Sequence, residues 1–215
     1  VSRHIVVICG GRYYKVKMFD DVSGKLRDRL QIQAALQGIL ESRDRAASFA
    51  ASPLEVSAEH KIPALTTLGR TKWAEVRDRY LLRDATNKVA LDAVERAIFA
   101  VSLDDYDQIT GSDEKFTDFS EHGKNIIHGD GTDRWLDKSF NLVISRNGRV
   151  GAHCEHTHSD APALCHVLDQ YTCREFHEAK ALFTGPNGEI EATPEQAKAI
   201  AKGTYPMYSA ERIIF

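Results

Sequence analysis

A β-hairpin signal in the second half of the chain places the strongest constraint on its fold. Asn147-Gly148 separates two β-prone runs, Ser139–Ser145 and Arg149–Cys154. An Asn-Gly step favours the positive φ angles of a tight turn, so the two runs are expected to pair as antiparallel strands. The first run alternates along its length, with Phe140, Leu142 and Ile144 on one face and Asn141, Val143 and Ser145 on the other. The chain must therefore build a sheet.

A second hairpin is predicted at the start of the chain. Ile5–Cys9 and Tyr13–Met18 are β-prone and flank Gly10-Gly11. Glycine supplies the positive φ angles that a tight turn between such runs requires. Phe99–Leu103 has the composition of a further strand. At least five strand-forming runs are thus spread over the chain.

Helical periodicity recurs between these runs. Leu and Ile residues are spaced at helical intervals from Lys25 to Glu41, which predicts an amphipathic helix. Thr71 and Thr86 are the predicted N-caps of two more helices. The first carries Trp73, Val76 and Tyr80 on one face, and the second is expected to direct Leu91, Val94 and Ile98 inward.

The other segments complete a mixed pattern. Arg43–Pro53 is expected to be a loop or a frayed helix end, and Ser112–His122 a polar surface segment. Asp160–Leu168 is predicted to be helical, and a last helix is predicted to begin at Thr193-Pro194-Glu195 and to end at Gly203. Strands and helices are interspersed without an internal repeat, which favours an α/β or α+β layered fold.

Composition narrows the class of protein. The net charge of −3 gives no global attraction to nucleic acid. No apolar run approaches the roughly 20 residues that span a bilayer, and we find no targeting segment before Ile5. The four cysteines, Cys9, Cys154, Cys165 and Cys173, include no CxxC pair, which fits a reducing compartment.

Five of the nine histidines lie between His153 and His177, and they leave three interpretations open. One is a zinc site that uses His153, His156 and His158, since His is a common zinc ligand, although the spacing matches no known zinc signature. Another is that each histidine is an ordinary polar residue at a strand end. The third is a general base, because the unperturbed pKa of histidine, about 6.5, lies close to working pH. In that case Asp160, about one helical turn beyond His156, would support it.

The neighbourhood of His156 resembles the signature of the carnitine/choline acyltransferase family. In that family an Arg-aromatic-x-Asp-Lys run opens a strand, an Asn-Gly-type turn follows, and the next strand delivers a Glu-His pair with an acidic residue four positions later. The corresponding residues occur here in the same order and spacing: Arg134, Asp137-Lys138, Asn147-Gly148, Glu155-His156 and Asp160.

The resemblance also runs upstream, through Tyr13-Tyr14-Lys15, Trp73-Ala74 and Asn87-Lys88. These segments resemble the carnitine palmitoyltransferase branch in particular, especially its outer-mitochondrial type. The resemblance covers roughly residues 1–170 and fades beyond Gln170. It implies that residues 1–215 are a partial N-terminal catalytic half of an acyltransferase domain.

The resemblance implies both a fold and a reaction. The fold is one incomplete half of a two-domain structure, a chloramphenicol-acetyltransferase-like sandwich with a mixed sheet flanked by helices. The reaction transfers a fatty acyl group between coenzyme A and the 3-hydroxyl of carnitine, both of them substrates, with no cofactor and no metal. By family, the protein is mitochondrial, at the cytosolic face of the outer membrane, and any membrane association comes from segments absent from this chain.

The resemblance also assigns roles to residues. His156 is the expected general base and Asp160 its catalytic carboxylate, while Glu155 supports them. Arg134, Asp137 and Lys138 are expected to lock the loop–strand junction rather than to touch substrate. Because most of the carnitine and coenzyme A contacts of the family lie downstream of the catalytic histidine, the 215-residue piece alone is expected to have little or no transferase activity.

Two other functions stay open. One is a truncated or inactive paralogue that binds or scaffolds without catalysis, which binding measurements with coenzyme A and carnitine would separate from an active enzyme. The other is a metal-binding α/β domain built on the histidine cluster, which elemental analysis would test. Acyl-chain preference and oligomeric state do not follow from the sequence.

Overall fold

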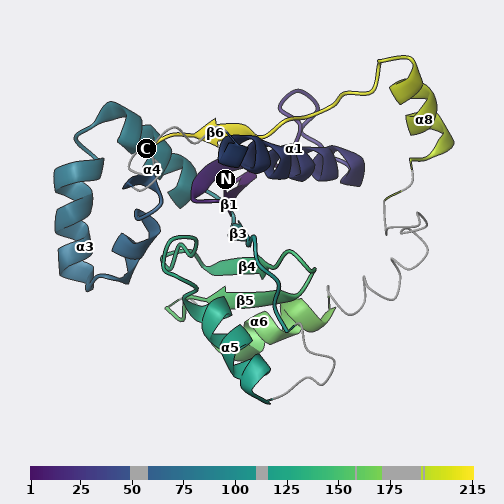
Figure 1. The fold of residues 1–215 in the computed structure, drawn as a ribbon. Helices are drawn as coiled ribbons and strands as arrows, with labels where there is room; N and C mark the ends of the chain where they lie inside the picture. The colour runs from purple at the N-terminus through teal and green to yellow at the C-terminus, as the bar shows by residue number, and fades with distance from the viewer. Residues whose placement is uncertain (49–57, 110–115, 158, 171–189, 191) are drawn as a thin grey trace.

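One mixed sheet organises the computed structural model (Figure 1), which describes residues 1–48, 58–109, 116–157, 159–170, 190 and 192–215. Within these residues the sheet has six strands in the order β5-β4-β3-β1-β2-β6. The strands are β1 (His4–Cys9), β2 (Arg12–Lys17), β3 (Ala100–Leu103), β4 (Phe140–Ile144), β5 (Val150–Cys154) and β6 (Glu211–Ile213). β1, β3 and β4 run parallel to one another, and the other neighbours are antiparallel. The expected mixed sheet with flanking helices is confirmed.

Both predicted hairpins are present. β1 pairs with β2 up to Cys9↔Arg12, and β4 pairs with β5 up to Ile144↔Val150. The turns depend on glycine: Gly11 has φ +67° and Gly148 has φ +79°. At Gly11 a side chain is also excluded by space, because an added Cβ would lie 1.1 Å from the His60 ring.

The predicted alternation along β4 is confirmed, and the structure shows what each face contacts. Asn141, Val143 and Ser145 are fully buried, whereas Phe140, Leu142 and Ile144 are partly buried. Asn141 is tolerated in the interior because its side-chain amide is satisfied: it accepts the Trp135 N–H at 3.1 Å and donates to the Trp135 carbonyl at 3.0 Å. The polar residue of the strand thus holds the segment that precedes it.

Strand β6 was not predicted. Its three residues are too few to form a recognisable pattern, and tertiary contacts create the strand. It pairs antiparallel with β2, so that Lys15 and Glu211 face each other across the sheet, 3.5 Å apart. The same carboxylate lies 2.9 Å from Lys17.

Helix α1 (Arg29–Ser48) begins four residues after the predicted start. Asp28 explains the shift, because its carboxylate accepts the Gln31 N–H at 3.0 Å while the Gln31 side chain accepts the Asp28 N–H at 3.2 Å. This reciprocal capping satisfies two N–H groups that a helix start leaves without partners. The helix continues through Ser48, so the first part of the expected 43–53 loop is helical, and residues 49–53 lie outside the described part of the chain.

The next two helices are present, but their predicted caps are wrong. Helix α3 (Arg70–Val76) begins after Gly69 and runs into a π-helical turn, η2 (Arg77–Leu81). Helix α4 (Ala85–Glu95) begins after Asp84, whose carboxylate accepts the Asn87 N–H at 2.9 Å. Thr71 and Thr86 therefore lie inside the helices.

Two side chains expected on the buried faces are exposed. Tyr80 lies in the π-helical turn, where the wider turn rotates it away from the face that Trp73 occupies. Ile98 follows the end of α4 and so does not continue its apolar face. Trp73, Leu91 and Val94 are buried as predicted.

The predicted N-cap of α4, Thr86, and the observed N-cap, Asp84, can be compared by substitution. Asp84→Ala should lower the free energy of unfolding by about 1 kcal/mol, because the Asn87 N–H loses its acceptor. Thr86→Ala should change it by less than about 0.5 kcal/mol, since Thr86 is not the cap. Urea unfolding of the two variants measures both values, and a larger loss for Thr86→Ala would contradict the structural assignment.

Helix α5 (Phe116–Ile127) was also not predicted, since its polar composition suggested a surface segment. The Ile126 side chain of this helix is buried against β5. A Cβ added to Gly151 of that strand would lie 2.5 Å from the Ile126 side chain. The close approach needs glycine at that position of the strand.

The predicted helices near the end are confirmed as α6 (Ala161–Leu168) and α8 (Pro194–Ala201), and α8 has a Thr193/Gln196 capping box.

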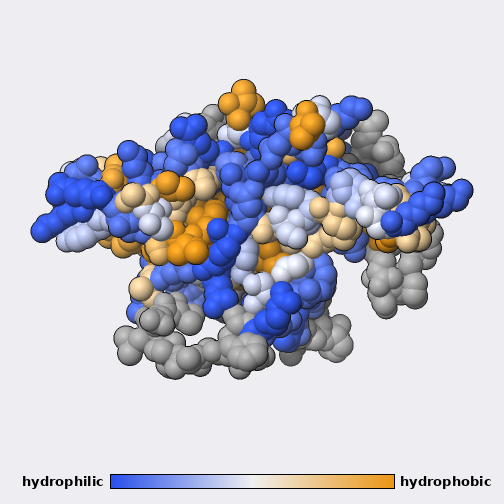
Figure 2. All heavy atoms as spheres, turned by 90° about the horizontal axis from the view of Figure 1, so that it is seen from above, coloured by the Kyte–Doolittle hydropathy of each residue, from blue (hydrophilic) through white to orange (hydrophobic). Residues whose placement is uncertain are grey.

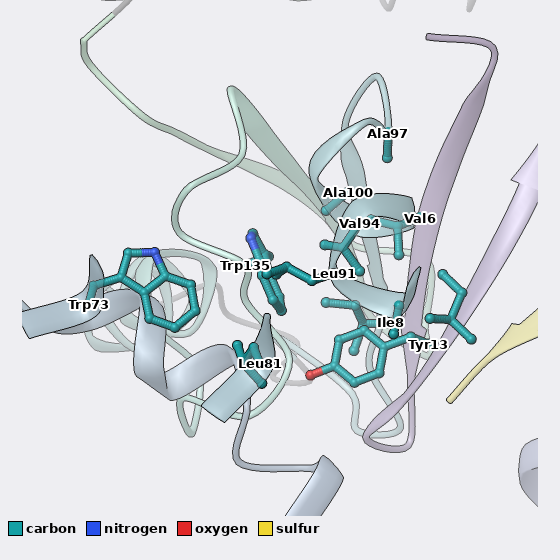
Figure 3. Close-up of a cluster of buried hydrophobic side chains, with 12 residues drawn as sticks. Val6, Ile8, Tyr13, Trp73, Leu81, Leu91, Val94, Ala97, Ala100 and Trp135 are labelled. Carbon is teal, nitrogen blue, oxygen red and sulfur yellow. The ribbon is translucent and has the colours of Figure 1, made fainter. Parts of the chain in front are cut away.

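Two apolar clusters cover the two faces of the sheet. Helix α1 packs on one cluster, through Ala35 and Ile39, against Val7 and Val101 of the strands. Helices α3 and α4 pack on the other, where Trp135 lies in edge contact with both Tyr13 and Trp73 (Figure 3). A short 3₁₀ helix, η1 (Pro63–Thr67), borders this second cluster. No helix in the described ranges is long and apolar enough to cross a membrane.

Candidate active site

The β4–β5 hairpin positions the Glu155-His156 pair. β5 ends at Cys154, and the Glu155 N–H still donates to the Ser139 carbonyl at 3.1 Å, so the pairing extends to the residue before His156. The Glu155 carboxylate then accepts the Thr157 N–H at 2.8 Å and also the Thr157 hydroxyl. These bonds turn the backbone directly after the strand, with His156 at the bend.

His156 and Asp160 lie close together, as the predicted spacing implied. The His156 Nδ1 atom is 3.7 Å from an Asp160 carboxylate oxygen, which is longer than a hydrogen bond and within the range of an ion pair. Asp160 occupies the N-cap position of α6 but makes no side-chain cap bond to that helix. Its carboxylate is therefore available to the imidazole. The two side chains are 77% and 85% exposed.

Arg134 lies in the interior, away from the exposed His156 loop. Its guanidinium forms two bonds of 3.0 Å to the Asp104 carboxylate and a bond of 3.1 Å to the Asn125 carbonyl. The Arg134 and Asp104 side chains are 1% and 0% exposed. This pair joins the segment before β4 to the end of β3 and to α5.

Asp137 and Lys138 bind the same segment to the helices on the other side. Asp137 accepts the Trp73 indole N–H at 2.5 Å and a bond from Arg70 at 2.7 Å. The Lys138 ammonium donates to the carbonyls of Glu95 and Ala97, both at 2.6 Å. Burial lowers the pKa of Lys138, and the Glu95 carboxylate opposes that shift. The three residues from the Arg-Trp-x-Asp-Lys run thus contact the scaffold.

A groove of about 820 Å³ separates this scaffold from the His156 loop. Polar groups from η1, α3, the segment before β4 and the loop line most of it. They include Thr66, Arg70, Asp137, Glu155 and Thr157. The arrangement leaves space for a polar ligand beside the loop that carries His156.

Sequence reasoning missed Asp104 and Asn125, the partners of Arg134. Asp104 follows the apolar strand run at 99–103, and a carboxylate at the end of a buried strand is a weak signal for a buried ion pair. Asn125 carries no signal, because α5 itself was not predicted. The two residues also bond to each other, with the Asn125 amide donating to Asp104 at 3.0 Å.

Asp133 shares this buried cluster. Its carboxylate lies 2.7 Å from the Arg134 guanidinium. Burial raises the pKa of Asp133 to about 7, Arg134 opposes the shift, and the neighbouring Asp104 carboxylate adds to it. The Asp133 carboxyl in this cluster therefore keeps its proton at pH values where a solvated aspartate has already released it.

The pKa of Asp133 predicts a pH dependence of stability. The folded-state pKa, about 7, lies above the unfolded value of about 3.9, so the folded protein binds the proton more tightly. The free energy of unfolding should therefore fall as pH rises through this window and level off above it. Asp133→Asn, which is neutral throughout, should reduce the fall.

Urea unfolding at about pH 5 and about pH 8 tests this expectation. Asp107→Asn is the matched control, because Asp107 is a surface carboxylate whose pKa is lowered by its bond to Arg146. The Asp107→Asn variant should show the same decrease in the free energy of unfolding with rising pH as the wild type. Equal slopes for the wild type and Asp133→Asn would show that the Asp133 carboxyl does not hold the proton.

The histidine cluster does not come together as a metal site within the described ranges, where no three His, Cys, Asp or Glu side chains converge. His158, one of the three histidines of that interpretation, lies outside those ranges. His153 is half-buried on β5, where burial and the nearby Arg134 charge lower its pKa.

Comparison with known proteins identifies similar sequences. A family model described as Choline/Carnitine o-acyltransferase matches residues 1–203. The liver isoform of carnitine O-palmitoyltransferase 1 from Homo sapiens is 36% identical over 168 residues, which are 78% of this chain and 20% of the relative. The muscle isoform from Sus scrofa is 31% identical over an aligned length of 221, covering 97% of this chain and 27% of the relative.

A second group of relatives is similar at the same level. Mitochondrial carnitine O-palmitoyltransferase 2 from Bos taurus is 33% identical over 169 residues, which are 79% of this chain and 22% of the relative. The chain thus spans about a fifth to a quarter of the length of the relatives it matches.

Proposed function

The chain belongs to the choline/carnitine acyltransferase family, and on this premise we propose that it is part of a carnitine O-acyltransferase of palmitoyl type. The proposed reaction moves a fatty acyl group between coenzyme A and the 3-hydroxyl of carnitine. The observation that carries the proposal is the His156–Asp160 pair at the end of the β4–β5 hairpin, inside the segment that the family model matches.

His156 is the proposed general base. It takes the proton from the carnitine hydroxyl, or from the coenzyme A thiol in the reverse direction, and the deprotonated atom attacks the acyl carbonyl directly. A well-placed base of this kind contributes about 10²–10⁴-fold to the rate. The ring is solvent-exposed, so a substrate can reach it.

Asp160 is the proposed catalytic carboxylate beside the base. An anion near the imidazole stabilises the imidazolium that forms when His156 accepts a proton. The Nδ1–carboxylate distance of 3.7 Å would shorten to a hydrogen bond with a small movement of the loop. Nδ1 would then carry its hydrogen toward Asp160 and leave Nε2 free to accept the substrate proton.

The other residues that match the family pattern are proposed to position this pair. Glu155 shapes the bend at His156 through its bonds to Thr157. Arg134, Asp137 and Lys138 anchor the start of β4, and β4 in turn holds β5 in register. Cys154 is not a proposed nucleophile, because burial raises the pKa of its thiol and disfavours the thiolate.

The proposed architecture is a chloramphenicol-acetyltransferase-like half of a two-domain enzyme, with residues 1–215 forming part of its N-terminal catalytic half. Acyl-coenzyme A and carnitine are the proposed substrates, and the proton transfer and direct attack require no cofactor. The name of the bovine relative supports a mitochondrial location.

The test measures release of free thiol from palmitoyl-coenzyme A by the full-length protein, with and without carnitine. Carnitine-dependent release, together with formation of palmitoylcarnitine, is the expected result. Thiol release that carnitine does not change would contradict the proposal. Binding of both substrates without turnover would instead indicate an inactive paralogue.

A further inference from the structure

The proposed reaction gives no role to the hydroxyl of Thr157, the residue directly after His156. Thr157 lies near the start of the loop that joins β5, which ends at Cys154, to α6, which begins at Ala161. It also borders the groove beside this loop. Two roles are therefore open to Thr157: contact with a substrate in the groove, or support of the loop.

Packing does not hold the two proposed catalytic side chains in place. The face of the molecule in Figure 2 is largely polar, with apolar side chains in small patches, and the loop around His156 is polar and exposed as well. The His156 and Asp160 side chains are 77% and 85% exposed, so few neighbours restrict their rotation. Their separation, 3.7 Å between Nδ1 and a carboxylate oxygen, therefore depends on the backbone that carries them.

Helix α6 fixes the backbone at Asp160. The residue is the N-cap of this helix, and its carbonyl accepts the Ala163 N–H at 3.0 Å. Pro162 lies in the first turn, where its ring holds φ near the helical value. The helix thus sets the attachment point of the Asp160 side chain, and the backbone at His156 is the part that needs separate support.

The Glu155 carboxylate supplies that support. The Glu155 N–H donates to the Ser139 carbonyl at 3.1 Å, so the backbone of this residue is still held by the end of the sheet. One oxygen of its carboxylate, Oε2, accepts both the Thr157 N–H, at 2.8 Å, and the Thr157 hydroxyl. The two bonds close a ring across His156, which lies between the residues that they join.

The hydroxyl bond distinguishes threonine from most other residues at this position. The N–H bond can form with any residue except proline, whereas the second bond requires a side-chain donor such as a hydroxyl. A glutamate side chain loses rotamer freedom when it is ordered, and two bonds offset that loss better than one. The branched Thr157 side chain also has restricted rotation about χ1, which favours a fixed hydroxyl direction. The hydroxyl therefore raises the fraction of time for which the ring is closed.

We propose that Thr157 is a positioning residue: its hydroxyl holds the Glu155 carboxylate across the bend and so fixes the backbone at His156, which keeps the imidazole within reach of Asp160. This inference rests on the proposed function, because it names a residue that supports the proposed base. In this role Thr157 touches neither substrate nor the transferred proton. Removal of the hydroxyl should therefore lower kcat and leave KM nearly unchanged.

Thr157→Val tests the proposal in the full-length protein, because valine has nearly the shape of threonine and keeps the N–H but lacks the hydroxyl. The kcat for carnitine-dependent thiol release should fall about 3- to 30-fold, since a displaced catalytic group loses rate steeply. The KM values for palmitoyl-coenzyme A and carnitine should change by less than about twofold. Thr157→Ser, which restores the hydroxyl, should return kcat to within about twofold of the wild type.

A double variant shows whether Thr157 acts through Glu155. Glu155→Ala removes the acceptor of both bonds. Adding Thr157→Val to Glu155→Ala should then cause no further loss of kcat, because the hydroxyl has no carboxylate left to hold. A further loss as large as that of the single Thr157→Val variant would show that the hydroxyl acts elsewhere, and would overturn the proposal.

Thr132 offers a matched control, because it makes the same pair of bonds. Its N–H, at 2.9 Å, and its hydroxyl, at 2.5 Å, both donate to one carboxylate oxygen of Asp130 in the turn between α5 and β4. Thr132→Val should keep the wild-type kcat. Similar losses in the two valine variants would contradict a specific role for Thr157.

Other kinetic results would also refute the positioning role. A Thr157→Val variant with wild-type kcat has no need of the hydroxyl. A rise in KM at unchanged kcat would instead make Thr157 a substrate contact in the groove. A Thr157→Ser variant as slow as Thr157→Val would show that the hydroxyl is not what matters at this position.

Hydrogen exchange separates this inference from the proposed function. The amide of residue 157 should exchange faster, relative to its intrinsic rate, in Thr157→Val than in the wild type or Thr157→Ser. Mass spectrometry with electron-transfer fragmentation measures this amide by itself, and equal exchange in all three proteins would refute the ring. If the wild type shows no carnitine-dependent thiol release, the proposed function fails, while the exchange result still decides whether Thr157 holds the bend.

Discussion

His156→Ala in the full-length protein should lower kcat for carnitine-dependent acyl transfer by about 10²–10⁴-fold, the contribution expected of a general base. The variant lacks the imidazole that accepts the proton from the carnitine hydroxyl in the proposed reaction. The ring is exposed and makes no buried contacts, so its removal should leave the fold unchanged. The KM for either substrate should change much less than kcat, because the base acts on the reacting hydrogen.

His166→Ala provides the matched control. His166 is an exposed histidine on α6, the helix that follows the same loop. The His166→Ala variant should keep the wild-type kcat. Thiol release and thermal unfolding measured on both variants separate a catalytic loss from a folding defect. A His156→Ala protein with wild-type kcat would refute the role of His156 as base.

Arg134→Met should lower the free energy of unfolding by about 3–5 kcal/mol, which is the typical cost of breaking a buried ion pair from one side. The substitution leaves the Asp104 carboxylate in the interior without its two guanidinium bonds of 3.0 Å. It also removes the bonds to the Asn125 carbonyl that hold α5. Since α5 packs on β5 through Ile126, the loss should extend to the strand that carries His156.

Arg146→Met is the matched control, because Arg146 forms the same two-bond contact with Asp107, also at 3.0 Å, at the surface. These side chains are 62% and 35% exposed. Solvent screens such a pair, and its loss should cost about 0–1 kcal/mol. Urea unfolding at one pH measures both variants.

A second substitution checks the cause of the Arg134 effect. If the cost comes from an uncompensated carboxylate, Arg134→Met combined with Asp104→Leu should regain part of the lost stability. A double variant no more stable than Arg134→Met would show that packing around the guanidinium, rather than its charge, is responsible. Equal losses for Arg134→Met and Arg146→Met would contradict the importance of burial.

The strands that carry their own local signal could be predicted from the sequence. Both hairpins follow from glycine-containing turns between β-prone runs, because the turn conformation is a property of the residues themselves. The helix near the end of the chain follows for the same reason, from Thr193 and Gln196 as a capping box.

Elements without local signal were missed. β6 is a strand because β2 offers it an edge, and the Lys15–Glu211 contact forms only once the two are paired. α5 has few apolar residues, and its one buried isoleucine is accommodated by a glycine on a strand that follows it in the chain. The predicted caps of α3 and α4 were each two residues too late: α3 begins after Gly69, which has no capping side chain, and α4 begins after Asp84.

The candidate site also combines features that the sequence predicts with features that only the structure reveals. The sequence by itself determined that His156 follows a β-hairpin and that Asp160 lies about one turn away, since both depend on short-range geometry. Only the tertiary structure decided that Arg134 is buried against Asp104 and that Asp137 accepts the Trp73 indole N–H. Such partners come from separate elements of the chain, and burial, charge pairing and hydrogen bonding depend on distances in space that spacing along a sequence does not encode.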